Sequence, residues 1–225
     1  MSNKKKNNSV DDAQVDSVAV ADWRNASTRN ERGRLIREAL FQAAAEVVGE
    51  RGYQDASITL ITQRAGVAQG TFYNHFESRQ DILDKLLPTL GKDMLDYVRT
   101  CSREGTTLVE REELGFKGFF SFLKKNPHFF RILNEAESFA PKGHREHLDL
   151  VASGYVRMLS RARDNGELPG YDERELEAIS FMLMAARSYL GWRYVYGEEK
   201  QSDVPDWVVQ LYSKFISTGF SNKPI

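Results

Sequence analysis

Apolar residues recur every three or four positions along most of this chain, and that spacing is the feature that most constrains its fold. The first run extends from Leu35 to Val48 and stops before Gly52, a residue type common at helix C-termini. No stretch alternates as a β-strand would. The pattern predicts an all-α protein. We expect a first helix from Arg34, then helices over about residues 57–66, from 68 or 69 to the interruption at 77–78, and over 78–103, 106–125, 127–139, 145–165, 172–196 and 205–219.

The composition indicates where in the cell this helical chain is expected to work. Its apolar runs fall far short of the ~20 residues that cross a bilayer, so we expect no membrane association. The lysines near the N-terminus have no apolar segment behind them, so we expect no secretory signal and a cytoplasmic location. Cys101 is the single cysteine, which excludes a disulfide framework and a thiolate metal cluster.

Positive charge is concentrated at the start of the first patterned region. The net charge of −1 gives no general sign of nucleic-acid binding. Five arginines nevertheless lie close together: Arg24, Arg29, Arg32, Arg34 and Arg37. Such a cluster can meet phosphates or a narrow minor groove, or it can form a solvated arm and helix face. The charges alone favour neither interpretation.

Residues 67–80, "VAQGTFYNHFESRQ", crowd four rings into little more than one helical turn. At about 100° per residue, Phe72 and Phe76 point to the same side, so we expect them to lie in the core. Tyr73 flanks that side, and its hydroxyl can reach outward. The rings are therefore divided between packing and binding.

The side chains on the outer side of residues 69–75 are polar and include no acid. Gln69, Thr71, Asn74 and His75 form hydrogen bonds, which suits a partner that presents phosphates and base edges. Gly70 costs up to ~1 kcal/mol in a helix relative to alanine, and a close approach of the partner to the backbone would explain it. Two short helices joined by "AGVA" predict a helix-turn-helix whose second helix enters a major groove.

The stretch "SITLITQRAGVAQGTFYNHFESRQDIL" resembles the DNA-binding segment of the TetR family of bacterial transcriptional regulators. The preceding "RLIREALFQAAAEVVGERGYQDAS" is similar to that family's first helix, and the match covers about residues 34–87. Residues 1–30 are polar and show no period, which predicts a disordered tail. The resemblance implies two regions after it: a helix-turn-helix DNA-binding domain over 31–80, and a larger helical ligand-binding and dimerisation domain over 81–225.

Carried over to this chain, the resemblance also implies roles for individual residues. Ser57 would cap the second helix at a phosphate, and Thr59 would face DNA from its first turn. Gln69 and Thr71 would approach bases, with Gly70 close to the DNA and Asn74 at the groove edge. The implied backbone contacts are Tyr73, His75 and Arg79.

The chain departs from the family pattern at three positions. Ala68 replaces the usual capping serine, Gln69 stands where lysine is common, and Thr62 replaces an alanine between the two helices. Residues 31–90 hold seven Lys and Arg against eight Asp and Glu, a balance of −1. Affinity for DNA must then come from local placement and from two copies, so we expect a homodimer.

The second half carries the candidate ligand site. Seven phenylalanines lie between Phe116 and Phe139. A core explains most of them, and some would line an apolar ligand pocket if the resemblance holds. The effector would be hydrophobic or amphipathic, with an anionic head as one option. We expect no cofactor. The candidate ligand residues are Phe119, Phe122, Phe129, Arg131, Asn134, Glu135 and Arg187. For Arg187, an ion pair at the dimer seam is slightly favoured over a ligand contact.

Broad apolar faces near the end of the chain suit a helical bundle between two subunits. The candidate dimer residues are Leu183, Leu190, Trp207, Val208, Leu211, Tyr212 and Phe215. The resulting hypothesis is a homodimeric repressor that leaves a palindromic, double-stranded operator when a ligand binds. Pro88 would either kink the fourth helix, which would transmit the ligand signal, or mark the junction of two shorter helices.

Two other functions remain open at this point. A helical enzyme or metal protein could use His144 and His147, but no third ligand has a clear spacing, and a solvated helix start is the better interpretation. No serine or cysteine has a visible base partner, so we expect no catalytic residue. The other alternative is a scaffold that keeps the fold without reading DNA.

Overall fold

The structure is a computed structural model, and it describes residues 23–196 and 203–220. Within these residues all regular secondary structure is helical, as predicted. The α-helices are α1 (Arg29–Arg51), α2 (Ile58–Ala65), α3 (Gln69–Tyr73), α4 (Arg79–Cys101), α5 (Leu108–Lys125), α6 (Phe129–Phe139), α7 (Pro141–Asp164), α8 (Glu173–Gly191) and α9 (Asp206–Phe220). Two 3-10 turns, η1 (Trp23–Asn25) and η2 (Ser102–Glu104), and a π-helical turn, η3 (Trp192–Tyr196), complete the path.

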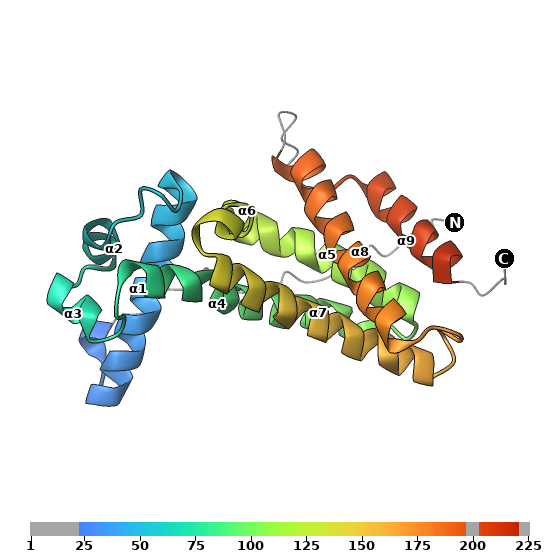
Figure 1. Ribbon diagram of the computed structural model, residues 1–225, viewed down its shortest axis with the longest axis horizontal. Helices are drawn as coiled ribbons and strands as arrows, with labels where there is room; N and C mark the ends of the chain where they lie inside the picture. The colour runs from blue at the N-terminus through green and yellow to red at the C-terminus, as the bar shows by residue number, and fades with distance from the viewer. Residues whose placement is uncertain (1–22, 197–202, 221–225) are drawn as a thin grey trace, which may run out of the picture.

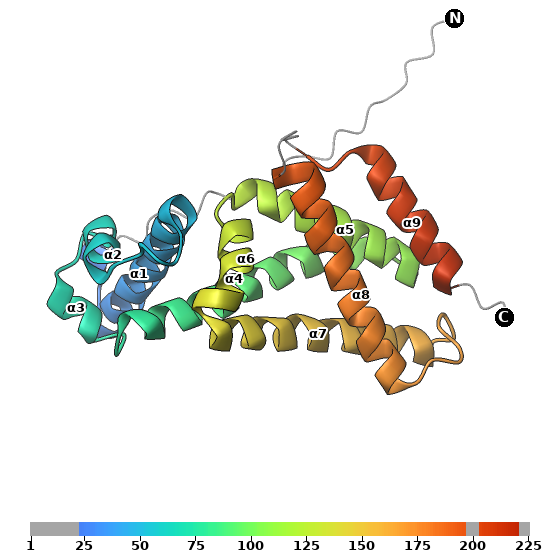
Figure 2. The ribbon, with the colours of Figure 1, turned by 45° about the horizontal axis from the view of Figure 1, so that its top comes forward.

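Helices α1–α3 gather at one end of the molecule, and α4 leads from them into a larger bundle formed by α5–α9 (Figure 1). In that bundle α7 lies along α4, while α8 and α9 pack over α5 (Figure 2). Phe72 and Phe76 are fully buried between α1, α3 and α4, as their spacing predicts. These buried rings hold α3 in the group formed by α1–α3, and the larger bundle lies beyond that group.

Ordered structure begins earlier than expected. Residues 1–22 of the predicted tail lie outside the described residues, but the prediction of disorder is wrong for residues 23–30. The hydroxyl of Thr28 accepts the amide of Glu31 at 3.1 Å and starts α1, and the Glu31 carboxylate accepts the amide of Ser27 at 2.8 Å. The Trp23 ring lies under the guanidinium of Arg32. A Thr-x-x-Glu capping pattern that the apolar spacing does not reveal explains the difference.

Helix α4 passes through Pro88 without a break, so the two-helix alternative is wrong. Proline cannot donate to the carbonyl of Asp84 four residues earlier. The first turn of α7 packs against that same carbonyl, so closely that a Cβ on Gly143 would overlap it. Helix α7 therefore begins at Pro141, earlier than the predicted residue 145, because this contact and a proline in the first turn favour an early start.

Candidate functional site

Local backbone contacts build the helix-turn-helix at the small end. Ser57 caps α2 by accepting the amide of Leu60 at 3.3 Å. Gly66 ends α2 in the left-handed region, with φ 67°, which a residue with a Cβ rarely adopts. The amide of Val67 then returns to the carbonyl of Thr62 at 3.0 Å. Ala68 gives α3 no side-chain cap, in agreement with the sequence.

The polar side of α3 is open to solvent. Gln69, Tyr73 and Asn74 are exposed, and Thr71 and His75 are half-buried. Tyr73 is 59 % exposed although its ring packs edge-on against Phe72 at 5.5 Å. A Cβ on Gly70 would find no atom within 4 Å, so no contact within the described chain requires glycine there.

Gln69 and Thr59 form one hydrogen-bonded unit on this surface. The side-chain amide of Gln69 donates to the hydroxyl of Thr59 at 2.7 Å, which joins the start of α3 to the first turn of α2. The hydroxyl of Thr62, the third departure from the family pattern, is buried and donates to the carbonyl of Ile58 at 2.9 Å. Threonine at position 62 therefore leaves no unpaired group between the helices.

His75 contributes a neutral ring. Burial lowers its pKa below the usual value, and the nearby Arg37 guanidinium lowers it further. Arg37 donates to the carbonyl of His75 at 3.2 Å and lies over the ring of Phe76. Because its pKa is lowered, His75 offers a hydrogen bond rather than a positive charge near pH 7.

Arg79 does not lie where the resemblance implies. Its guanidinium donates to the carbonyls of Ala56 at 2.7 Å and Gln54 at 3.0 Å, and also to that of Tyr53. These bonds brace the loop between α1 and α2. Most of the donors of Arg79 are already occupied, so the expected backbone contact is corrected to a role within the domain.

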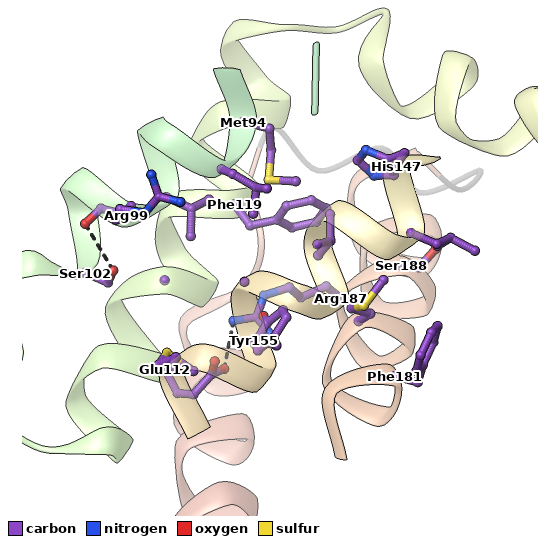
Figure 3. Close-up of a pocket in the computed structure, with 18 of the residues that line it drawn as sticks. Met94, Arg99, Ser102, Glu112, Phe119, His147, Tyr155, Phe181, Arg187 and Ser188 are labelled. Carbon is purple, nitrogen blue, oxygen red and sulfur yellow. Dashed lines mark hydrogen bonds and ion pairs between the residues drawn. The ribbon is translucent and has the colours of Figure 1, made fainter. Parts of the chain in front are cut away.

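The large bundle holds a cavity of about 1280 Å³ between α4, α5, α6, α7 and α8 (Figure 3). Its apolar wall includes Met94, Leu95, Phe119, Phe129, Val151 and Met184. Of the predicted ligand residues, Phe119, Phe129, Asn134 and Arg187 line this space. Phe122 does not, because its ring packs into the core against Phe129 at 5.2 Å.

Arginines surround one end of the cavity, where α4 and α7 end and α5 begins. They are Arg99, Arg103, Arg111, Arg157 and Arg161. Arg99 pairs with Asp96 at 2.6 Å, and Arg111 donates to the carbonyl of Gly105 at 2.9 Å. Within the described residues, the side chains of Arg103, Arg157 and Arg161 form no hydrogen bond or ion pair. This arginine end was not found from the sequence, because its members are scattered over 63 positions between Arg99 and Arg161.

Arg187 is part of a closed network inside the protomer (Figure 3). It pairs with Glu112 at 2.8 Å and donates to the hydroxyl of Tyr212 at 2.9 Å, and that hydroxyl donates to Glu112 at 2.8 Å. Burial alone would lower the pKa of Arg187, but the Glu112 carboxylate more than offsets this and keeps the guanidinium charged. The ion pair therefore lies within one chain, and its predicted place at the dimer seam is wrong.

Arg131 and Glu135 lie on the other side of α6, at the junction with α1. Arg131 donates to the carbonyls of Gly49 at 3.2 Å and Glu50 at 3.0 Å, and pairs with Glu135 at 2.6 Å. Glu135 in turn accepts the amide of Tyr53 at 2.9 Å. We call this set the α6 clasp. These two residues were predicted as ligand contacts, but the structure uses them to join the two parts of the molecule.

His147 is almost completely buried on the cavity wall, so the predicted solvated helix start is wrong for this residue. It is buried because its ring packs against Gly91 on α4 and edge-on against Phe129 on α6. No group of three or more His, Cys, Asp or Glu side chains in the described part of the chain could hold a metal ion. No described helix is long and apolar enough to cross a membrane.

An exposed apolar surface, which we call the α8–α9 face, covers the outer side of these two helices. It comprises Phe181, Met182, Tyr189, Trp207, Leu211 and Phe215, together with Trp192 of η3. Phe181 and Tyr189 also line the cavity. Three members of this face were predicted for the dimer interface. Leu183, Val208 and Tyr212 were also predicted, but they are buried within the protomer, and Leu190 is half-buried. The sequence does not tell which side of an apolar helix meets its own subunit, and this explains the misplaced residues.

Comparison with known proteins agrees with this architecture. Residues 40–86 match the model of the bacterial regulatory proteins of the tetR family. The transcriptional repressor BepR of Brucella suis is 41% identical over 173 residues, which cover 72% of this chain and 82% of BepR. The fatty acid metabolism regulator protein of Bacillus subtilis is 28% identical over 121 residues, covering 53% of this chain and 62% of that relative.

Solved structures share the fold. FadR from Bacillus subtilis in complex with stearoyl-CoA superposes with a TM-score of 0.66 at 22% identity, covering 83% of this chain and 99% of that one. FadR from Bacillus halodurans gives a TM-score of 0.69 at 21% identity, with 81% and 98% covered. Together with the helix-turn-helix geometry, these matches show that the chain belongs to the TetR family of bacterial regulatory proteins.

Proposed function

We propose that the protein is a homodimeric transcriptional repressor that binds a palindromic operator in the cytoplasm and releases it when an amphipathic effector enters the cavity. The observation that carries this proposal is the outer side of α3. It presents hydrogen-bonding side chains without any acid, on a helix-turn-helix whose second helix is free to enter a groove.

The proposed contacts divide into two sets. Gln69 and Thr71 read base edges, because an amide and a hydroxyl at the start of a reading helix reach the floor of the major groove. Tyr73 and the neutral His75 donate to phosphates, with Asn74 at the groove edge. Ser57 and Thr59 lie at the start of α2, whose free amides favour a nearby phosphate. Open space around Gly70 allows the DNA backbone to approach.

Two copies are needed for useful affinity. The reading domain carries slightly more acidic than basic residues, so the general attraction to DNA is weak. The α8–α9 face exposes large rings such as Trp207, 56 % exposed, and Phe215, 70 % exposed, which are costly to leave in water. We infer that two copies pair through this face and place two α3 helices on half-sites separated by one or more helical turns.

The cavity supports an effector with an apolar body and an anionic head. Its wall combines apolar side chains with the arginine end, where the side chains of Arg103, Arg157 and Arg161 have no partner in the described chain. A carboxylate or phosphate there would satisfy these cations. The FadR structure with stearoyl-CoA, which shares the fold, holds a ligand of this kind. We propose a long-chain acyl compound with an anionic head group.

The α6 clasp offers a route from the cavity to the DNA-binding domain. Leu133, Asn134 and Glu137 of α6 line the cavity, whereas Arg131 and Glu135 hold the end of α1. A ligand that moves α6 would therefore shift the reading domain. Release then requires that the effector bind the DNA-incompetent arrangement more tightly than the competent one.

A binding experiment tests the proposal as a whole. The purified protein is mixed with labelled DNA flanking its own gene, and the shift is compared with that of unrelated DNA at low salt. A specific complex that palmitate or palmitoyl-CoA dissociates is the expected result. Absence of any sequence preference at low salt would overturn the regulator proposal and leave a scaffold in its place.

A further inference from the structure

His147 leaves an unpaired polar atom in the wall of the cavity. Its side chain is 3 % exposed, and its Nδ1 is buried without a hydrogen-bond partner. Buried polar atoms are usually paired, so the unpaired Nδ1 indicates which of the two ring nitrogens carries the proton. The ring packs edge-on against Phe129, with centroids 6.2 Å apart, and Figure 3 shows it among the residues that line the cavity.

Gly91 sets the orientation of the ring. A Cβ on Gly91 would overlap Nδ1 and lie 2.7 Å from Cε1, so this edge of the imidazole faces α4. The opposite edge, with Nε2, points away from α4. In the described chain Nε2, unlike Nδ1, is not a buried atom without a partner. The one nitrogen available to a molecule in the cavity is therefore Nε2.

The imidazole is neutral under physiological conditions. Burial lowers the pKa of His147 to about 4, and the nearby His144 contributes to the decrease. A neutral imidazole carries one N–H. A buried donor without an acceptor is less well tolerated than a buried acceptor, so the proton belongs on Nε2 and Nδ1 is left bare. The ring then offers a single uncharged donor to the cavity.

The distance from His147 to the arginine end defines the shape of the effector. On α7, ten residues separate His147 from Arg157, which is ~15 Å along a helix. Helix α4 runs in the same direction along the cavity, from Gly91 beside His147 to Arg99 at the arginine end. The cavity-lining residues between these ends are largely apolar on both helices, for example Met94 and Val151.

We propose that His147 is a specificity-determining residue, which donates a hydrogen bond from Nε2 to an uncharged oxygen of the effector, ~15 Å from its anionic head. This inference deepens the proposed function, because it assigns a second polar group to the effector of the same cavity. The oxygen is uncharged, as in a ketone or hydroxyl. A second carboxylate would lie away from the arginine end, in a cavity whose wall already includes the Glu137 side chain.

The test compares hexadecanoate with its oxo and hydroxy derivatives, in which the oxygen is moved along the chain. Affinity for the full-length protein is measured by calorimetry. The wild type is expected to bind derivatives oxygenated in the half remote from the carboxylate about tenfold more tightly than hexadecanoate. His147→Phe keeps an aromatic ring without a donor and should lose this preference. His128→Phe, at a half-buried histidine that does not line the cavity, should retain it.

A measurement on the unmutated protein guards against a folding defect in the variants. Long-range proton–nitrogen spectra should show His147 protonated at Nε2 and bare at Nδ1, with the Nε2 signal shifted by the preferred derivative. Equal affinity for all derivatives, a preference that survives in His147→Phe, or a proton on Nδ1 would overturn the inference. If hexadecanoate still binds and releases the operator in those cases, the proposed function stands. If no derivative binds, the inference and the proposed effector class both fail.

Discussion

Removing one side chain of the α6 clasp tests how the two parts of the molecule communicate. Arg131→Met keeps the apolar stem but deletes the donors to the carbonyls of Gly49 and Glu50, at 3.2 and 3.0 Å, and the ion pair with Glu135 at 2.6 Å. Glu135 can still accept the amide of Tyr53. The variant therefore loosens the link between α6 and α1 without emptying the interface.

The expected magnitude follows from these contacts. The Arg131 and Glu135 side chains are 42% and 27% exposed, so solvent screens the pair and each bond contributes at the low end of its range. The three interactions together are worth about 1–2 kcal/mol. If α6 carries the signal, the effector's influence on operator affinity should fall by the same free energy, about 5–30-fold. Effector affinity without DNA should stay within about twofold, because Arg131 does not line the cavity.

Fluorescence anisotropy with labelled operator, with and without saturating effector, measures this coupling. Arg145→Met serves as the matched control, because Arg145 is an exposed arginine on α7 outside the clasp. An unchanged effector response in Arg131→Met would refute the role of α6. Transmission would then have to pass through α4 and Pro88, as the sequence first suggested.

Three further predictions concern other parts of the molecule. Gly70→Ala should stabilise the protein by up to ~1 kcal/mol, because its Cβ meets no atom, yet weaken operator binding about tenfold or more by blocking the DNA. Arg187→Met should strand the buried Glu112 and cost about 3–5 kcal/mol, a loss of roughly 6–20 °C in Tm, whereas replacing both residues by Met should recover most of it. Phe215→Glu should separate the dimer in sedimentation experiments and leave the helical circular dichroism unchanged.

Each of these has a contradicting outcome. Operator binding by Gly70→Ala at wild-type strength would mean that no DNA approaches α3 at that point. If the double replacement of Arg187 and Glu112 is as unstable as the single one, the loss of stability does not come from an unpaired Glu112 charge. An intact dimer in Phe215→Glu would exclude the α8–α9 face as the interface. Asp149→Ala changes the charge at an exposed position on α7, away from that face, and serves as the control.

What the sequence predicted well depends on short-range order. The inward direction of Phe72 and Phe76, the cap at Ser57 and the stop at Gly66 follow from residues within one or two turns, and the structure confirms each of them. Helical period and turn chemistry act locally, so they can be read directly from neighbouring residues.

What the sequence did not predict depends on contacts between distant residues. Arg79 reaches carbonyls 23 to 26 positions away, and Arg131 reaches carbonyls 81 and 82 positions away. The carbonyls that bind these two arginines lie far away in the sequence, so local patterns could not indicate them. The burial of His147 likewise depends on Gly91, a residue on a different helix. Spacing alone cannot show such pairings.

The bond between Gln69 and Thr59 has a consequence for how operator preference could change over evolution. Because the two side chains hold each other at 2.7 Å, the orientation of the Gln69 amide is decided in part by a residue on the preceding helix. Replacing Thr59 by valine would leave that amide free to rotate and to accept either a donor or an acceptor from a base. A regulator built this way can broaden its set of operators through a residue that never touches a base, and can narrow it again by restoring one hydroxyl.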